Sequence, residues 1–248
     1  MTTPPIPLGD FRTANLRISP KPKKLDQGGV LAMTYAGEEV VLKLPTARVP
    51  FDASFGYKNE GSKVEVKLEL PNASEFEAAR RVLSAIDAAV AAYLRSNASS
   101  ICTDLGMKSK AHADKVQDLQ TGNKFYPLLR QPNEARYPET VTLKWAPEGK
   151  VVPAIVNKSN APVPWEQIKR DSVVMAVIKV KGVFLNTSLT TIQVEPVAFL
   201  VTPKTTVNTA TLFSDEMTGA GVDDEDEAQP APAKKPRFFD EETAAEDD

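Results

Sequence analysis

The stretch SKVEVKLELPNASEFEAARRVLSAIDAAVAAYLRSN, residues 62–97, places an alternating segment directly before a helical one. Apolar and charged residues alternate over residues 63–70, which predicts a half-buried strand with a charge-paired solvent face. Ser74 and Glu77 then have the spacing of a helix capping box. Apolar residues recur at intervals of three and four from Phe76 to Tyr93, which predicts one amphipathic helix over 74–96.

Further strand-like segments lie on both sides of this helix. They are VLAMTYAGEEVVLKLP (30–45), with a turn at Ala36-Gly37, and then TVTLKW (140–145), VVPAIV (151–156), DSVVMAVIKVKGVFL (171–185) and TTIQVEPVAFLV (190–201). Pro196 marks a bulge or an edge. The polar residues 105–121 fit either a short helix or an insertion loop. One helix between two sets of strands predicts an α+β fold with a mostly antiparallel sheet or barrel.

Composition divides the 248 residues into three parts. Residues 1–27 are rich in proline and polar residues, which predicts an irregular lead-in, and residues 28–213 predict a single β-rich domain. Residues 214–248 carry thirteen acidic and three basic side chains and few aliphatic ones, which predicts a disordered acidic tail. The rest of the chain carries 27 basic and 20 acidic residues. A basic body with an acidic tail predicts a polyanion-binding surface and a segment that can compete for it.

Signals of a membrane, secreted or catalytic protein are weak. No apolar run reaches the ~20 residues that span a bilayer, and no signal peptide is predicted at the N-terminus. The single cysteine, Cys102, fits a reducing compartment, so we expect an intracellular protein. His112 is the only histidine and Gly28-Gly29 is a turn pair rather than a phosphate loop, so we predict no enzyme, no cofactor and no metal site.

Rings beside cations suit single-stranded nucleic acid. Aromatic faces stack bases at ~1–3 kcal/mol each, and cations release counterions from phosphates. Such pairs recur in GNKFYPLLRQPNEARYPETVTLKW (122–145), in FDASFGYK (51–58) with Phe51, and around residues 179–184. The candidate binding residues are Phe55, Tyr57, Lys58, Lys124, Phe125, Tyr126, Arg130, Arg136, Tyr137, Lys144, Lys179, Lys181 and Phe184.

Core packing is the alternative for each ring. Trp145 is in phase with Val141 and Leu143, so we expect it in the core. One ring of Phe125 and Tyr126 is expected to be buried, and Tyr126 and Tyr137 are the best candidates for stacking. Lysines 179 and 181, on one face of a strand, fit a groove or ordinary solvation equally. Arginines 80 and 81 fit the wet flank of the helix.

Four phrases carry a family resemblance. They are VPFDASFGY (49–57), RVLSAIDAAVAAYLRSNAS (81–99), KFYPLLR (124–130) and SVVMAVIKVKGVFLNTSLTTIQVEPVAFLV (172–201). In this order they resemble the single-stranded DNA-binding proteins of nucleocytoplasmic large DNA viruses. The resemblance implies an oligonucleotide/oligosaccharide-binding-like barrel core with an added helix. It also implies a role in viral DNA replication, repair or recombination, at the host nucleus or a cytoplasmic replication site.

Two hypotheses of function follow. The first is a sequence-nonspecific single-stranded DNA-binding protein, with RNA as an alternative ligand. Its acidic tail lowers DNA affinity and recruits replication proteins, with Phe238 and Phe239 as a docking motif. The second is a structural or assembly protein, or an acidic-tailed chaperone that binds basic proteins. A homo-oligomer is compatible with either.

Overall fold

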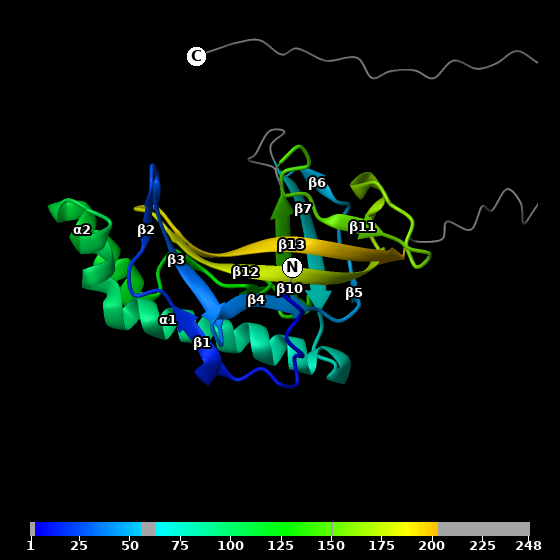
Figure 1. Ribbon diagram of the computed structural model, residues 1–248, viewed down its shortest axis with the longest axis horizontal. Coiled ribbons are helices and arrows are strands. Elements are labelled where there is room, and N and C mark those ends of the chain that lie inside the picture. The colour runs from blue at the N-terminus through cyan, green and yellow to red at the C-terminus, as the bar shows by residue number, and fades with distance from the viewer. Residues whose placement is uncertain (1–2, 56–62, 150, 203–248) are drawn as a thin grey trace, which may run out of the picture. The chain divides into compact units, whose positions relative to one another are not determined.

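The computed structural model describes residues 3–55, 63–149 and 151–202. These residues form a nine-stranded and a four-stranded sheet beside two α-helices (Figure 1). The nine-stranded sheet contains β1 (Leu16–Ile18), β2 (Lys23–Leu25), β3 (Gly28–Tyr35), β4 (Glu38–Lys43), β5 (Ala47–Arg48), β8 (Phe125–Tyr126), β11 (Ala154–Val156), β12 (Val173–Leu185) and β13 (Thr190–Thr202). The four-stranded sheet contains β6 (Ser54–Phe55), β7 (Val64–Leu70), β9 (Leu129–Arg130) and β10 (Glu139–Trp145). The helices are α1 (Ser74–Asp104) and α2 (Ser109–Thr121), with 3-10 turns η1 (Thr13–Asn15) and η2 (Trp165–Gln167).

The long β12–β13 hairpin is the centre of the large sheet. β12 pairs with β4 over residues 177–180 and with β3 over 182–185, so the sheet curls where the partner changes (Figure 1). Pairing is antiparallel except where β8 and β11 run parallel to β13. The predicted α+β class with a mainly antiparallel, barrel-like sheet is confirmed.

The predicted turn between β3 and β4 is present at Ala36-Gly37. Both residues have positive φ, 51° and 88°, as in the tight turns whose twist matches that of the strands they join. The irregularity predicted at Pro196 is also confirmed, because the register of β12 against β13 shifts there and leaves Val197 unpaired.

The small sheet buries one face against the core. Val64, Val66, Leu68 and Leu70 of β7 are buried, and so are Val141, Leu143 and Trp145 of β10. The predicted alternation of β7 and the core position of Trp145 are therefore confirmed. The Trp145 ring lies 5.4 Å from the ring of Phe199 in β13, so the two sheets pack together at this contact.

Helix α1 begins at the predicted residue and continues past the predicted end at residue 96 to Asp104. Asn97 lies within the helix, and its side-chain amide donates to the carbonyl of Tyr93 at 2.9 Å. Ala98, Ile101 and Cys102 extend the buried stripe, and this packing favours further helix. The predicted capping box is wrong: Ala73 is the N-cap and makes no side-chain capping bond.

Two side chains of α1 fix neighbouring segments to it. The Tyr93 hydroxyl donates to the carbonyl of Ser19 at 3.0 Å. The Asp87 carboxylate accepts from the backbone N–H groups of Leu128 and Leu129 at 2.7 and 3.1 Å. The Tyr93 bond holds the residue after β1 against the helix. The Asp87 bonds hold the chain that enters β9.

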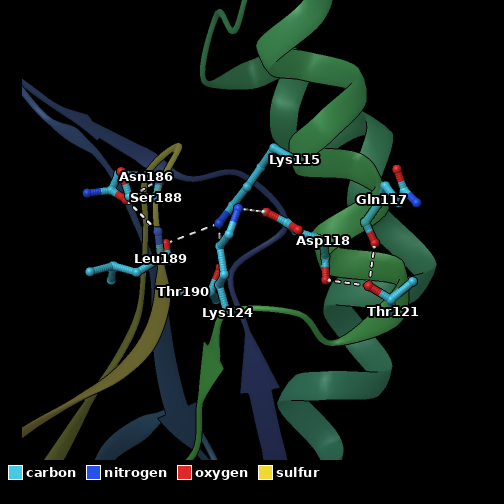
Figure 2. A network of polar contacts seen from close by, with 9 residues as sticks. All are labelled: Lys115, Gln117, Asp118, Thr121, Lys124, Asn186, Ser188, Leu189 and Thr190. Atoms are coloured by element: carbon cyan, nitrogen blue, oxygen red, sulfur yellow. Dashed lines mark hydrogen bonds and ion pairs between the residues drawn. The ribbon is translucent and has the colours of Figure 1, made fainter.

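Residues 109–121 form helix α2, which settles the alternative left open by the sequence. Lys115 of α2 is 1% exposed, and its Nζ donates to the carbonyl of Leu189 at 3.1 Å and to Thr190 Oγ1 at 2.9 Å (Figure 2). Asp118, one turn later, pairs with Lys124 at 3.0 Å. The helix is thereby fixed to the turn of the β12–β13 hairpin.

The prediction of an irregular lead-in over 1–27 is wrong for the residues that the structure describes. Two strands, β1 and β2, pair with β3, and the N–H of Ile6 donates to the carbonyl of Val41 at 2.8 Å. Phe11 and Leu16 are buried in the core. The strands are three residues each, too short to show a period, and their pairing with β3 stabilises them.

Some predictions fall outside the described residues: Tyr57, Lys58, and the tail 214–248 with Phe238 and Phe239. In the described ranges, neither helix combines the length and the apolar character that crossing a membrane requires.

Candidate nucleic-acid interface

Both sheets contribute side chains to an open groove of about 2010 Å³. Because β7 and β10 bury every second residue, the residues between them, such as Glu65, Lys67 and Lys144, face this groove. The large sheet contributes Lys181 and Phe184. The loop between β9 and β10 lines it as well.

Positive charge exceeds negative charge in this groove. Five acidic residues line it: Glu65, Glu69, Glu134, Glu139 and Glu195. Nine basic residues line it: Arg48, Lys63, Lys67, Arg80, Arg130, Arg136, Lys144, Arg170 and Lys181. A cleft with this excess concentrates anions near it.

Each of the five carboxylates is paired with a groove cation. Glu65 is shared between Lys144 at 2.6 Å and Lys67 at 3.6 Å. The other pairs are Arg48–Glu69 (3.8 Å), Arg80–Glu139 (2.6 Å), Arg136–Glu134 (2.8 Å) and Lys181–Glu195. Of these pairs, Arg136–Glu134 is the most exposed, with 69% and 58% of the two side chains accessible, and such solvent-exposed pairs contribute only about 0–1 kcal/mol. An incoming phosphate can therefore replace the carboxylate at Arg136 at little cost, whereas the other four glutamates are more shielded from water.

Three exposed rings each carry a cation over one face. Lys67 Nζ lies 5.7 Å from the ring centre of Phe51, which is 62% exposed. Arg136 Cζ lies 4.9 Å from the ring of Tyr137, which is 53% exposed. Arg130 Cζ lies 4.9 Å from the ring of Tyr126, which is 44% exposed. All three cations line the groove, as do Phe51 and Tyr137.

The structure brings six of the candidate residues together in the groove. They are Arg130, Arg136, Tyr137, Lys144, Lys181 and Phe184. Tyr126 supports Arg130 from outside the groove lining.

Four candidates lie elsewhere. Phe55 packs edge-on against Trp165 at 5.4 Å, Lys124 pairs with Asp118, and Lys179 pairs with Glu39. Phe125 is partly buried against the core, as expected for one ring of its pair.

Lys179 and Lys181 are separated by a bulge in β12. Val180 pairs with Val194 and Gly182 with Gln193, so Lys181 is the extra residue. Lys179 and Lys181 both lie on the face away from the core, as expected, but the alternation of buried and exposed residues shifts by one position after the bulge. Buried side chains change from even to odd positions here, with Val183 buried, and Phe184 joins the groove lining.

Sequence reasoning did not single out several groove cations. Lys67 could have been found, because it lies between Glu65 and Glu69 on the outward face of β7. Arg80 was expected on the wet flank of the helix, but it pairs with Glu139. No sequence pattern points to Arg48 or Arg170, which come from other segments.

Asp87 positions the entry to β9 although its charge is poorly solvated there. Burial raises its pKa to about 6, against the lowering effects of the Leu128 and Leu129 N–H groups and of Arg130. Leu128 and Leu129 directly precede Arg130, so this carboxylate holds the backbone from which the Arg130 side chain projects.

In the part of the chain that the structure describes, no group of three or more His, Cys, Asp or Glu residues could hold a metal ion. Cys102 is buried, and burial raises the pKa of its thiol.

Comparison with solved structures gives chains of similar fold at 12% identity. The single-stranded DNA-binding protein of bacteriophage Enc34 in complex with single-stranded DNA matches with a TM-score of 0.42, over 73% of this chain and 94% of that chain. The same protein alone matches with 0.42, over 79% and 99%, and its C-terminal truncation with 0.40, over 77% and 97%. No family model and no curated protein matches the sequence. This likeness concerns the fold alone and assigns no ligand to the chain, and the resemblance to proteins of large DNA viruses stays a prediction.

Proposed function

We propose that this protein binds single-stranded DNA along the groove, without sequence preference. The observation that carries the proposal is the coincidence, in one groove, of surplus positive charge with exposed rings that have a cation over one face. Phe51 and Tyr137 are 62% and 53% exposed, so their rings are accessible for stacking on a base, and the neighbouring cations can contact a phosphate.

An unpaired strand fits these features better than a duplex. In a duplex both faces of each base are already stacked, so rings such as Phe51 and Tyr137 have no base to bind. Stacking depends little on which base is present, so binding is nonspecific. RNA has the same faces and phosphates, and the DNA preference is to be tested with matched oligonucleotides.

Ring truncation tests the proposal directly. Phe51→Ala and Tyr137→Ala should each weaken binding of a labelled oligo-dT by about 5- to 100-fold in an anisotropy titration, since each ring stacks one base. Phe55→Ala is the matched control, because this exposed ring packs on Trp165 outside the groove lining. Equal affinity of all three variants and the unaltered protein would remove the groove from the binding site.

In the same proposal, the acidic segment 214–248 regulates DNA binding and recruits partners. Its charge is opposite to that of the groove, so it competes with DNA and offers replication partners a docking segment around Phe238 and Phe239. The resemblance in sequence supports a role for this activity in viral DNA replication, repair or recombination, which we include in the proposal. Binding of basic proteins by the tail, with no affinity of the full chain for oligo-dT, would favour an assembly protein or chaperone instead.

A further inference from the structure

We propose that Arg130 is a fixed phosphate-binding site within the groove, where one phosphate of the strand docks before the paired cations exchange their carboxylates. The proposal deepens the function proposed above and rests on it for the identity of the strand. Its own ligand class is a phosphate oxyanion.

Among the described residues, Arg130 is the partly buried cation of the groove that makes no side-chain hydrogen bond or ion pair. Six of the nine basic residues pair with the five carboxylates. Among the described residues, Lys63, Arg130 and Arg170 make no side-chain hydrogen bond or ion pair. Lys63 and Arg170 are exposed to water, whereas Arg130 is partly buried. Its five N–H donors are therefore the ones in the groove that most need an acceptor.

Because the Arg130 guanidinium is partly buried, leaving its charged N–H donors without an acceptor costs free energy. Burial lowers the pKa of Arg130, while Asp87, Glu65 and Tyr126 act on the guanidinium in the opposite direction. None of these three is in hydrogen-bond contact with it. A phosphate can accept two parallel N–H bonds from a guanidinium, which would satisfy donors that the protein leaves open.

The guanidinium is also held in place before any ligand arrives. Tyr126 supports one face at 4.9 Å, and Asp87 holds the two preceding backbone N–H groups. Arg130 itself pairs with Thr140 in the β9–β10 ladder. A cation fixed in this way loses little conformational entropy on binding. Lys67, Lys144 and Lys181 must instead give up a carboxylate.

An NMR titration with inorganic phosphate tests the site without DNA. The probe is the side-chain Nε–H signal of Arg130 in the full-length protein, assigned by its absence from Arg130→Gln, with phosphate replacing chloride at constant ionic strength. This signal should shift and saturate with phosphate, and the signal of ion-paired Arg136 should shift less. Equal shifts for the two arginines, or none, would overturn the proposal.

Titration with oligo-dT then asks whether the same group contacts the strand. Arg130→Gln should weaken binding about 10- to 100-fold and reduce the slope of log K against log salt by about 0.7, the value for one single-strand phosphate contact. Arg130→Lys, which keeps the charge but not the paired donors, should lie between. An unchanged slope, or a loss seen only with guanine-containing strands, contradicts a phosphate contact. If the unaltered protein binds phosphate at Arg130 but no oligonucleotide, the proposed function fails and the anion site stands.

Discussion

Gly182 permits the bulge that brings Lys181 and Phe184 to the groove. Its φ is 152°, and a Cβ at this position would lie 2.1 Å from the carbonyl oxygen of Leu31. Gly182→Ala should therefore lower the free energy of unfolding by at least about 1–3 kcal/mol, measured by urea denaturation. Gly9→Ala is the control, since a Cβ there meets nothing within 4 Å. Equal stability of the two variants would show that β12 accommodates the side chain without strain.

Asp87 should make stability depend on pH in a definite direction. Burial raises its pKa from 3.8 to about 6, so between these values the folded protein binds more protons than the unfolded chain. The free energy of unfolding then falls as pH rises, and a contribution of about 3 kcal/mol, full below about pH 4, is lost above about pH 6.

Asp87→Asn cannot titrate and isolates this effect. The difference in unfolding free energy between the unaltered protein and this variant should decrease steadily from pH 4 to pH 7, in urea denaturation at each pH. A difference that stays constant, or grows with pH, would mean that Asp87 is solvated well enough to ionise normally.

Helix α2 depends on one buried amine for its attachment. Lys115→Ala removes the donor to Leu189 and Thr190 and leaves a cavity, so it should cost about 2–5 kcal/mol. Amide hydrogen exchange should also accelerate in α2 and in the hairpin turn. Lys110→Ala, on the exposed side of the same helix, should change stability by less than about 0.5 kcal/mol. Unaltered exchange in Lys115→Ala would show that other contacts attach α2.

The elements differ in how far the sequence determines them. β7 has seven residues and α1 has 31. Segments of this length show the repeat of apolar residues that is typical of a strand or a helix, so both elements could be predicted. β5, β6, β8 and β9 have two residues each and no period of their own. They form because long strands such as β10 and β13 offer backbone partners. The end of α1 was missed because its last turns are stabilised by packing against the core rather than by helix propensity.

The groove could be predicted only in part, because segments that are far apart in the sequence line it together. Arg130, Arg136, Tyr137 and Lys144 come from one stretch of aromatic and basic residues, which is visible in the sequence. Their partners come from segments far away along the chain, such as Arg48 and Lys181. The pairing of cations with carboxylates depends on this assembly, so no local pattern could identify Arg130 as a partly buried cation that no carboxylate pairs with among the described residues.

Charge opposition between the groove and the C-terminal segment gives a test on the full chain. Residues 214–248 carry thirteen acidic and three basic side chains, and the groove lining carries more basic than acidic ones. A tethered polyanion competes with DNA at an effective concentration of the order of millimolar. The competition is screened as the Debye length falls below ~10 Å, its value at 0.1 M salt.

Removal of residues 214–248 should therefore tighten oligo-dT binding several-fold at 50 mM salt and have little effect at 300 mM. A full-length variant with every Asp and Glu of this segment replaced by Asn and Gln should behave like the truncated protein, because charge rather than length is responsible. Phe238→Ala with Phe239→Ala keeps the charge and should leave DNA affinity unchanged. If the truncated and neutralised proteins bind no more tightly than the unaltered one at low salt, the acidic segment does not compete for the groove, and its role lies with other partners.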